Sequence, residues 1–164
     1  MIRRFRLAAC MMVAVLSGAS LEASAQAPAS FDKFAGLWVG DGRLGTRSGE
    51  TEMVKCRATY RSEQQGTALK QSIRCASAGG SIEVKVAAEL DGENISGGWE
   101  ETTRGWTGRL AGATTPQGLK VRIRGENISA NMDVIIKDAL QVVEIQFIDG
   151  ALLGLTLILK KQSA

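Results

Sequence analysis

The residues of this chain that could do acid–base chemistry are two pairs of carboxylates, Glu100 with Glu101 and Glu50 with Glu52. Because adjacent residues of a strand point to opposite faces, Glu100 and Glu101 cannot enter one site if they lie on a strand. Glu50 and Glu52 fall at an exposed strand start. We therefore interpret both pairs as solvated side chains and predict no catalytic residue.

The composition excludes most other catalytic and metal-binding chemistry. The 164 residues contain no histidine, which removes Ser-His-Asp and Cys-His nucleophile systems and imidazole-ligated zinc or haem. Three cysteines are too few for a four-cysteine metal site. The sequence has no phosphate-binding loop either. We expect a protein that is not an enzyme and that holds neither a metal nor a cofactor.

Cys56 and Cys75 are expected to form a structural disulfide in an exported protein. If they face each other on neighbouring strands, the turn centres on 65–66 and Ala58 lies opposite Ile73, so apolar side chains meet. The bond would close a loop of about 18 residues and add about 3 kcal/mol to the stability. Because the spacing is not Cys-x-x-Cys, a redox-active pair is not expected.

The first 25 residues have the pattern of a secretory signal peptide. Three arginines precede an apolar run at 7–16, and Ala-Ser-Ala at 23–25 predicts cleavage before Gln26. The run is half the ~20 residues of a membrane-spanning helix. The context of Cys10 resembles a lipidation site, but most of the apolar run follows this cysteine, so we expect no lipid. The mature chain would carry a net charge of only about +1, which argues against nucleic-acid binding.

From residue 34 onward the chain predicts a succession of short antiparallel strands. Apolar and polar residues alternate within runs that Gly, Asn, Asp and Ser separate, and no segment has a convincing helical period. The expected strands are 34–43, 51–61, 68–76, 81–90, 94–102, 106–113, 118–125, 130–137, 140–148 and 152–161. We divide the mature chain into a short tail, 26–33, and a single β domain, 34–164.

Eight to ten strands with short connections predict an all-β fold, a closed antiparallel up-and-down barrel, because closure removes the exposed edges of a long sheet. Glycines inside the runs permit the sharp coiling that a small barrel needs. A β-sandwich is the alternative. A membrane-spanning barrel is not expected, since it needs two aromatic girdles and the chain has one tyrosine and three tryptophans.

The predicted hairpin places five basic residues on its outer face. We call them the basic ribbon: Lys55, Arg57, Arg61, Lys70 and Arg74. Arg57 would face Arg74 and Arg61 would face Lys70, and like charges opposite each other cost stability. Such a surface could hold an anionic membrane or an acidic protein. Alternatively it is a solvated face, with Glu83 of the next strand placed beside Arg74.

Phe34-Ala35-Gly36-Leu37-Trp38 resembles the Gly-x-Trp opening of the calycin barrels, which include lipocalins, avidins and fatty-acid-binding proteins. In that family the glycine lets the first strand bend, and the tryptophan closes one barrel end beneath a basic residue of the last strand. The resemblance implies that Gly36, Trp38 and either Lys161 or Lys160 close this barrel. The alternation of inward and outward side chains along the last strand favours Lys161. The chain lacks room for the C-terminal helix of lipocalins and shows no helical lid.

The stretch Cys56-Arg57-Ala58-Thr59-Tyr60, together with Ile73-Arg74-Cys75, also resembles a group of small secreted proteins of alphaproteobacteria. This resemblance spans most of the mature chain. It implies export and one disulfide-bonded domain, and it brings no known activity.

Two functions remain open for a periplasmic or secreted protein of this kind. The inward positions of the predicted strands are almost wholly aliphatic, which favours binding of a small apolar or amphipathic molecule. The same side chains could instead simply fill the barrel. The alternative is an interaction protein, such as a protease or lysozyme inhibitor, that presents the segment 26–30 or the loop 44–50 to its target.

Overall fold

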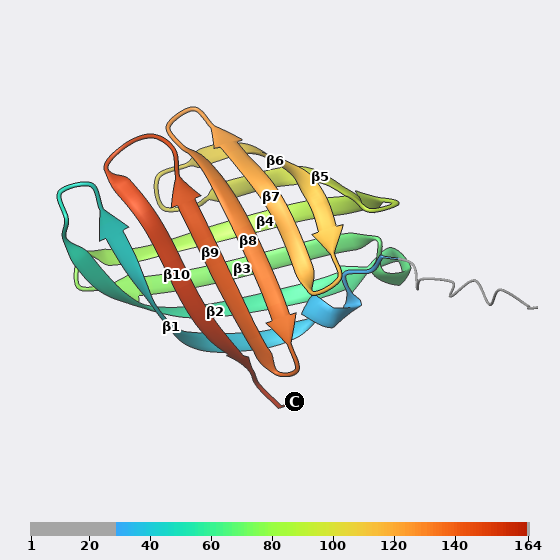
Figure 1. Cartoon of the computed structure of the whole chain (residues 1–164). Coiled ribbons are helices and arrows are strands. Elements are labelled where there is room, and N and C mark those ends of the chain that lie inside the picture. The colour runs from blue at the N-terminus through green and yellow to red at the C-terminus, as the bar shows by residue number, and fades with distance from the viewer. Residues whose placement is uncertain (1–28, 164) are drawn as a thin grey trace, which may run out of the picture.

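The computed structural model describes residues 29–163, in which ten antiparallel strands close into one barrel (Figure 1). Each strand pairs with its neighbours in the chain, and β1 pairs with β10. The strands are β1 (Gly36–Thr46), β2 (Thr51–Glu63), β3 (Ala68–Ser77), β4 (Gly80–Asp91), β5 (Asn94–Glu101), β6 (Trp106–Thr115), β7 (Gly118–Gly125), β8 (Ser129–Lys137), β9 (Leu140–Phe147) and β10 (Leu152–Lys161). The predicted up-and-down barrel is confirmed, and the sandwich alternative is excluded.

The ten predicted strands all form, with ends that differ by at most about three residues from the sequence expectation. The first strand runs over 36–46 instead of 34–43, because a short 3₁₀ helix, η1 (Asp32–Phe34), occupies the residues before it. A second one, η2 (Gln64–Gly66), forms the β2–β3 turn. None of the helices in residues 29–163 is long and apolar enough to cross a membrane. The expected signal peptide, its cleavage site and Cys10 lie outside the described residues.

The register of the β2–β3 hairpin is the one predicted from the cysteines. Cys56 lies opposite Cys75, and Ala58 lies opposite Ile73. The two cysteines are joined by a disulfide, with their Cα atoms 4.1 Å apart. The bond therefore connects two adjacent strands, and the alternation of side chains along each strand carries the apolar positions of this hairpin to the barrel interior.

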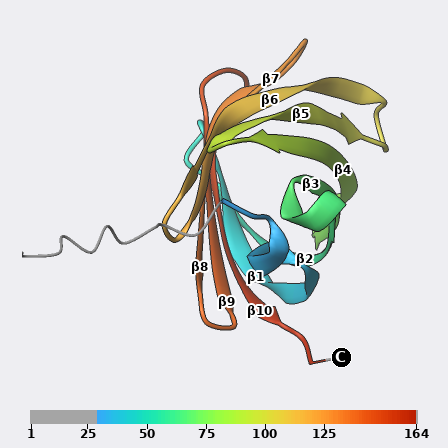
Figure 2. The same ribbon diagram turned by 90° about the vertical axis from the view of Figure 1, so that its right-hand side faces the viewer.

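The two ends of the barrel differ. One end, the terminal end, carries the start of β1, the end of β10, and both 3₁₀ helices; Figure 2 looks onto it. The other end, which we call the mouth, is formed by the connections β1–β2, β3–β4, β5–β6, β7–β8 and β9–β10. The most deeply buried large side chains, among them Trp38 and Phe34, lie toward the terminal end. This end therefore holds the packed core.

Candidate functional site

A plug of aromatic side chains seals the terminal end. Phe31, Phe34 and Trp38 are 0%, 1% and 0% exposed. The indole nitrogen of Trp38 donates a 2.8 Å hydrogen bond to the Phe34 carbonyl, and the Phe31 backbone N–H donates to the Gly66 carbonyl at 2.8 Å. The role of Phe31 was not predicted from the sequence, because a segment this short has no periodicity. The only signal was a pair of phenylalanines three residues apart in a chain with few aromatic residues.

The three residues that the calycin resemblance singles out come together at this end. Trp38 lies opposite Lys161 in the β1–β10 ladder, and the Lys161 ammonium nitrogen is 5.4 Å from the centre of the Trp38 ring. Gly36 has a φ of +124°, and a Cβ added there would lie 3.0 Å from the Cε atom of Lys161. Lys160 lies opposite Val39, on the outer face. The lysine over the tryptophan is therefore Lys161.

A small polar cluster lies inside the barrel beside the aromatic plug. The Tyr60 hydroxyl donates to Gln141 Oε1 at 3.2 Å, and Gln71 Nε2 donates to the Tyr60 oxygen at 3.3 Å. Burial raises the pKa of Tyr60 to about 12, although the hydrogen bond to Gln141 acts against the shift. Gln141 is 0% exposed, and its Nε2 atom has no acceptor among the described residues. Buried donors without partners are uncommon in proteins and cost stability.

Burial of the inward leucines of β10 decreases toward the mouth. Leu159 and Leu157 are 0% and 1% exposed, and Leu155 is only partly buried. Leu153, which is 54% exposed, lies at a register shift where Thr46 pairs with Leu152, so it is not counted among them. The same holds around the barrel, where other inward apolar side chains are only partly buried: Leu44, Ile73, Val86, Ile123, Met132 and Ile145. These inward side chains are therefore more accessible than Leu157, and we call this apolar part of the interior, toward the mouth, the cup.

Trp99 adds an aromatic wall to the cup. Its indole packs over two glycines, since a Cβ at Gly108 or Gly125 would lie 2.6 Å from the Trp99 ring. The indole nitrogen donates to the Arg124 carbonyl at 3.2 Å. Glycines inside the predicted strands were expected only to permit sharp coiling. Gly108 also makes room for the large Trp99 side chain.

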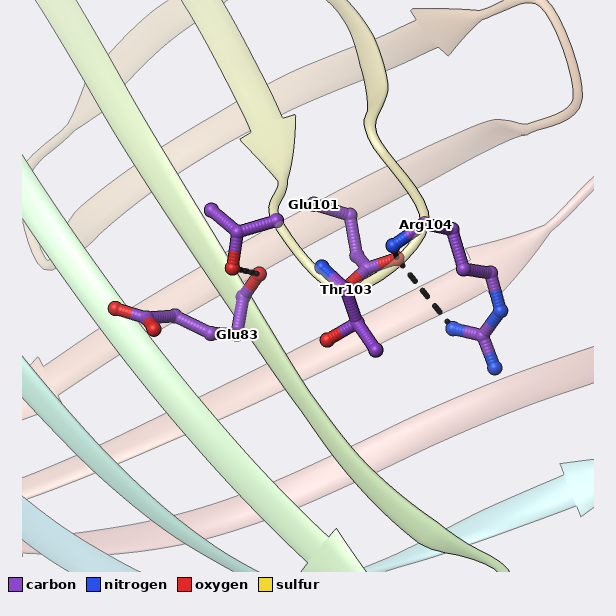
Figure 3. A network of polar contacts seen from close by, with 5 residues as sticks. Glu83, Glu101, Thr103 and Arg104 are labelled. Atoms are coloured by element: carbon purple, nitrogen blue, oxygen red, sulfur yellow. Dashed lines mark hydrogen bonds and ion pairs between the residues drawn. The ribbon is translucent and has the colours of Figure 1, made fainter.

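The β5–β6 loop forms part of the rim and is fixed by a buried carboxylate (Figure 3). Glu101 is 5% exposed and accepts hydrogen bonds from the backbone N–H groups of Thr103 and Arg104 at 2.7 and 3.0 Å. Burial alone would raise the pKa of Glu101, but the hydrogen bonds from Thr103 and Arg104 and the Arg104 charge together lower it below its usual value. The Thr102 backbone and hydroxyl donate to the Glu83 carbonyl at 2.9 and 3.4 Å.

The carboxylate pairs considered at the outset are not brought together. Glu101 points inward and lies opposite Trp106, whereas Glu100 lies opposite Lys85 on the outer face. At the β1–β2 turn, Glu52 accepts a hydrogen bond from the Gly79 backbone at 2.6 Å, and Glu50 accepts one from the Ser48 hydroxyl at 3.3 Å. These carboxylates hold loops at the mouth.

The basic ribbon has the predicted register, with Arg57 opposite Arg74 and Arg61 opposite Lys70. Two of its members are neutralised. Arg74 pairs with Glu83 at 3.1 Å, as the alternative interpretation expected, and Lys70 pairs with Glu63 at 2.9 Å. The hydrogen bond from Arg74 lowers the pKa of Glu83. The other three members, Lys55, Arg57 and Arg61, form no ion pair within residues 29–163.

A second basic surface, which the sequence analysis did not identify, lies on the outer face of β6 and β7. Arg109 lies directly opposite Arg124, and Arg122 lines the same shallow outer groove. Lys120, at the edge of this groove, pairs with Asp133 at 3.3 Å. The alternation of 118–125 did predict outward arginines, but only the pairing of β6 with β7 brings Arg109 to them.

The comparisons with known proteins concern the fold. No protein-family model and no curated protein matches the chain. Among solved structures, the chain is similar to Rv2717c from M. tuberculosis, with a TM-score of 0.68 and 12% identity over 80% of this chain and 94% of that one. It is also similar to the S-type phycobiliprotein lyase CPES from Guillardia theta, with a TM-score of 0.57 and 9% identity over 82% and 91%. Both are calycin-like barrels, so the architecture expected from the Gly-x-Trp segment is confirmed at the level of the fold.

Proposed function

We propose that this protein binds a small apolar or amphipathic molecule in the cup, and that the molecule enters through the mouth. The observation that carries the proposal is the change in burial along β10, where Leu157 and Leu159 are 1% and 0% exposed and Leu155, nearer the mouth, is only partly buried. The inward apolar side chains are thus more accessible toward the mouth than toward the terminal end. Burial of such a surface against a ligand is favourable by about 25 cal/mol per Å² of apolar area.

The rim and wall of the cup suit an apolar ligand. Ile82 and Trp106, both on inward positions at the mouth, are each 37% exposed. The Arg104 guanidinium lies 5.3 Å from the centre of the Trp106 ring and helps to hold this side chain. Aromatic side chains offer a large contact area at a low entropy cost, which favours Trp99 and Trp106 as ligand contacts. At the other end, the side chains of the plug around Trp38 are fully buried.

We propose that the protein binds its ligand without converting it and acts outside the cytoplasm. Glu101, a buried carboxylate on an inward position, is already engaged by its own loop. The disulfide fits an oxidising compartment, in agreement with the signal peptide expected in the first 25 residues and with the secreted proteins that the sequence resembles. One structural neighbour is a phycobiliprotein lyase, which agrees with a barrel that engages another molecule.

The test is displacement of an environment-sensitive apolar dye from the mature, oxidised protein. We expect saturable dye binding, loss of binding in Leu155→Glu, and unchanged binding in Thr156→Glu. Leu155 points into the cup and Thr156, its neighbour on β10, points outward, so the two variants add the same charge on opposite faces. If the folded parent binds no dye, or if both variants bind as the parent does, the interior is not the binding site.

A second surface favours capture at an anionic membrane or partner. Lys55, Arg57 and Arg61 lie on one strand without ion pairs in the described part of the chain. The attraction should weaken as salt screens it over a Debye length of ~8 Å at physiological ionic strength. Co-sedimentation with vesicles containing phosphatidylglycerol should fall at high salt and in Arg57→Gln/Arg61→Gln. If the protein does not bind these vesicles at low or at high salt, the basic surface does not capture membranes and only the interior site remains.

The inhibitor alternative has one structural observation in its favour. The β1–β2 loop is held in place by Arg47, which donates hydrogen bonds to the carbonyl oxygens of Phe147, Ile148 and Gly150 at 3.1, 2.7 and 2.9 Å. A loop fixed in this way is suited to insertion into a partner. If the mature protein inhibits a protease or lysozyme and binds no apolar dye, the inhibitor function is supported over ligand binding.

A further inference from the structure

The polar cluster of Tyr60, Gln71 and Gln141 is unexpected in the interior of an apolar barrel. Each member occupies an inward position on a different strand, β2, β3 and β9. Tyr60 and Gln141 are 6% and 0% exposed, whereas Gln71 is only partly buried. The inward side chain beside Gln71 on β4 is Val86, which belongs to the cup. The cluster therefore extends from the sealed core to the floor of the accessible interior.

The hydrogen-bonding groups of the cluster are unbalanced in favour of donors. The Tyr60 hydroxyl accepts from Gln71 and donates to Gln141, so its capacity is largely used. The Nε2 atom of Gln141 carries two N–H groups and has no acceptor within residues 29–163. Gln71 Nε2 has a second N–H beyond the one given to Tyr60. A molecule that places an oxygen acceptor here would satisfy donors that the described chain leaves unpaired.

The surroundings of the cluster disfavour a charged head group. The cross-strand neighbours of its members at inward positions are Gly36, Val86, Ile136 and Leu159, none of which is charged. A cation, Lys161, lies beside Gly36, but its ammonium group is placed over the Trp38 ring. Burial of a carboxylate without a paired cation is strongly unfavourable, whereas a carbonyl or hydroxyl oxygen needs only its hydrogen bonds. The raised pKa of Tyr60 has the same origin, because burial destabilises its anion.

We propose that the cluster is a head-group site for an uncharged oxygen acceptor, so that the ligand is a neutral amphipath such as a long-chain alcohol, ketone or amide. Its apolar chain lies along the cup and its head accepts hydrogen bonds from the amide groups of Gln71 and Gln141. This inference rests on the proposed function, since it assigns the ligand class for the same interior site. It assigns to Gln141 a recognition role that an aliphatic core residue at this position could not perform.

The experiment compares dodecanol, dodecanamide, dodecane and dodecanoate as competitors for the apolar dye at neutral pH, where dodecanoate is ionised. We expect dodecanol and dodecanamide to bind about three- to tenfold more tightly than dodecane, which corresponds to about one additional hydrogen bond, and more tightly than dodecanoate. Gln141→Leu should remove this preference. Gln146→Leu is the matched control, because Gln146 lies on the same strand and is exposed on the outer face.

Gln71→Leu provides a second variant at a partly buried position, so the test does not depend on the folding of Gln141→Leu. It should reduce the preference for dodecanol over dodecane in the same direction. Equal binding of dodecanol and dodecane, or an unchanged ratio in both cluster variants, would overturn the head-group site while leaving ligand binding in place. Tightest binding of dodecanoate would show that the site accepts anions and would also overturn it. Failure of every competitor and of the dye itself would overturn the proposed function together with this inference.

Discussion

The ammonium nitrogen of Lys161 lies 5.4 Å from the centre of the Trp38 ring and so joins the last strand to the first at the terminal end of the barrel. The same indole donates its N–H to the carbonyl of Phe34, which precedes the first strand. Trp38 thus connects the plug, the beginning of β1 and the end of β10. The side chains packed at this end are therefore more deeply buried than the inward side chains toward the mouth.

Trp38→Ala should lower the free energy of unfolding by about 3–5 kcal/mol, because it removes a fully buried indole and leaves a cavity at the sealed end. Denaturant unfolding followed by circular dichroism measures the change. Trp106→Ala, at a side chain that is 37% exposed, serves as the comparison and should cost less. An unfolding midpoint equal to that of the parent would show that Trp38 does not close the barrel.

Lys161→Met should destabilise the protein by about 0.5–1 kcal/mol, since methionine keeps most of the aliphatic contact but removes the charge over the Trp38 ring. Lys160→Met changes the neighbouring lysine on the outer face and should have a smaller effect. A double-mutant cycle with Trp38→Phe measures the coupling. An equal loss in both lysine variants would indicate a general charge effect and contradict a specific contact.

Reduction of the disulfide should lower the stability by about 3 kcal/mol, because the bond restricts a loop of 19 positions in the unfolded chain. Unfolding with and without a reductant measures this difference in stability.

The mature protein isolated from the periplasm should have the intact mass of residues 26–164 with one disulfide and no lipid. Two free thiols at Cys56 and Cys75, or a diacylglyceryl mass on Cys10, would contradict the predicted maturation.

Glu101→Gln should make the stability less dependent on pH under acidic conditions. The folded pKa of Glu101 is below its ordinary value of 4.5, so its ionised form stabilises the fold above that value. This contribution is lost as the pH falls through the lowered pKa. Chemical unfolding from neutral to acidic pH should therefore show a shallower decline in Glu101→Gln than in Glu100→Gln, which alters the outer face. Identical declines in the two variants would contradict the role of Glu101 in the loop.

Tyr60 is the single tyrosine of the chain, so its ionisation can be followed by ultraviolet absorbance without interference from another tyrosine. Tyrosinate should form with a midpoint of about 12 in the folded protein and near 10.0 in denaturant. Because the folded pKa is raised, the neutral phenol contributes stability that is complete below pH 10 and is lost as the pH rises toward 12. A midpoint near 10.0 in the folded protein would show that Tyr60 is not enclosed.

The sequence predicted the strands well because the alternation of apolar and polar residues is a local property. In 118–125, for example, each position is assigned to the interior or the exterior by its own polarity. The Cys56–Cys75 pair then determined the register of one hairpin, and with it the two like-charged pairs of the basic ribbon. Parity was also sufficient to select Lys161 over Lys160 as the partner of Trp38.

Only the tertiary structure decided which inward positions are sealed and which are accessible. Leu155 and Leu159 have the same side chain and the same parity on one strand, yet Leu155 is only partly buried and Leu159 is 0% exposed. Their difference depends on depth along the barrel axis and on the plug that Phe31 and Phe34 insert at one end, neither of which has a periodic signal. Gln141 likewise reads only as a polar residue at an inward position of β9. Its unpaired amide becomes visible only when closure of the barrel places it beside Tyr60, since contacts between distant strands are set by the global fold and not by the neighbours in the chain.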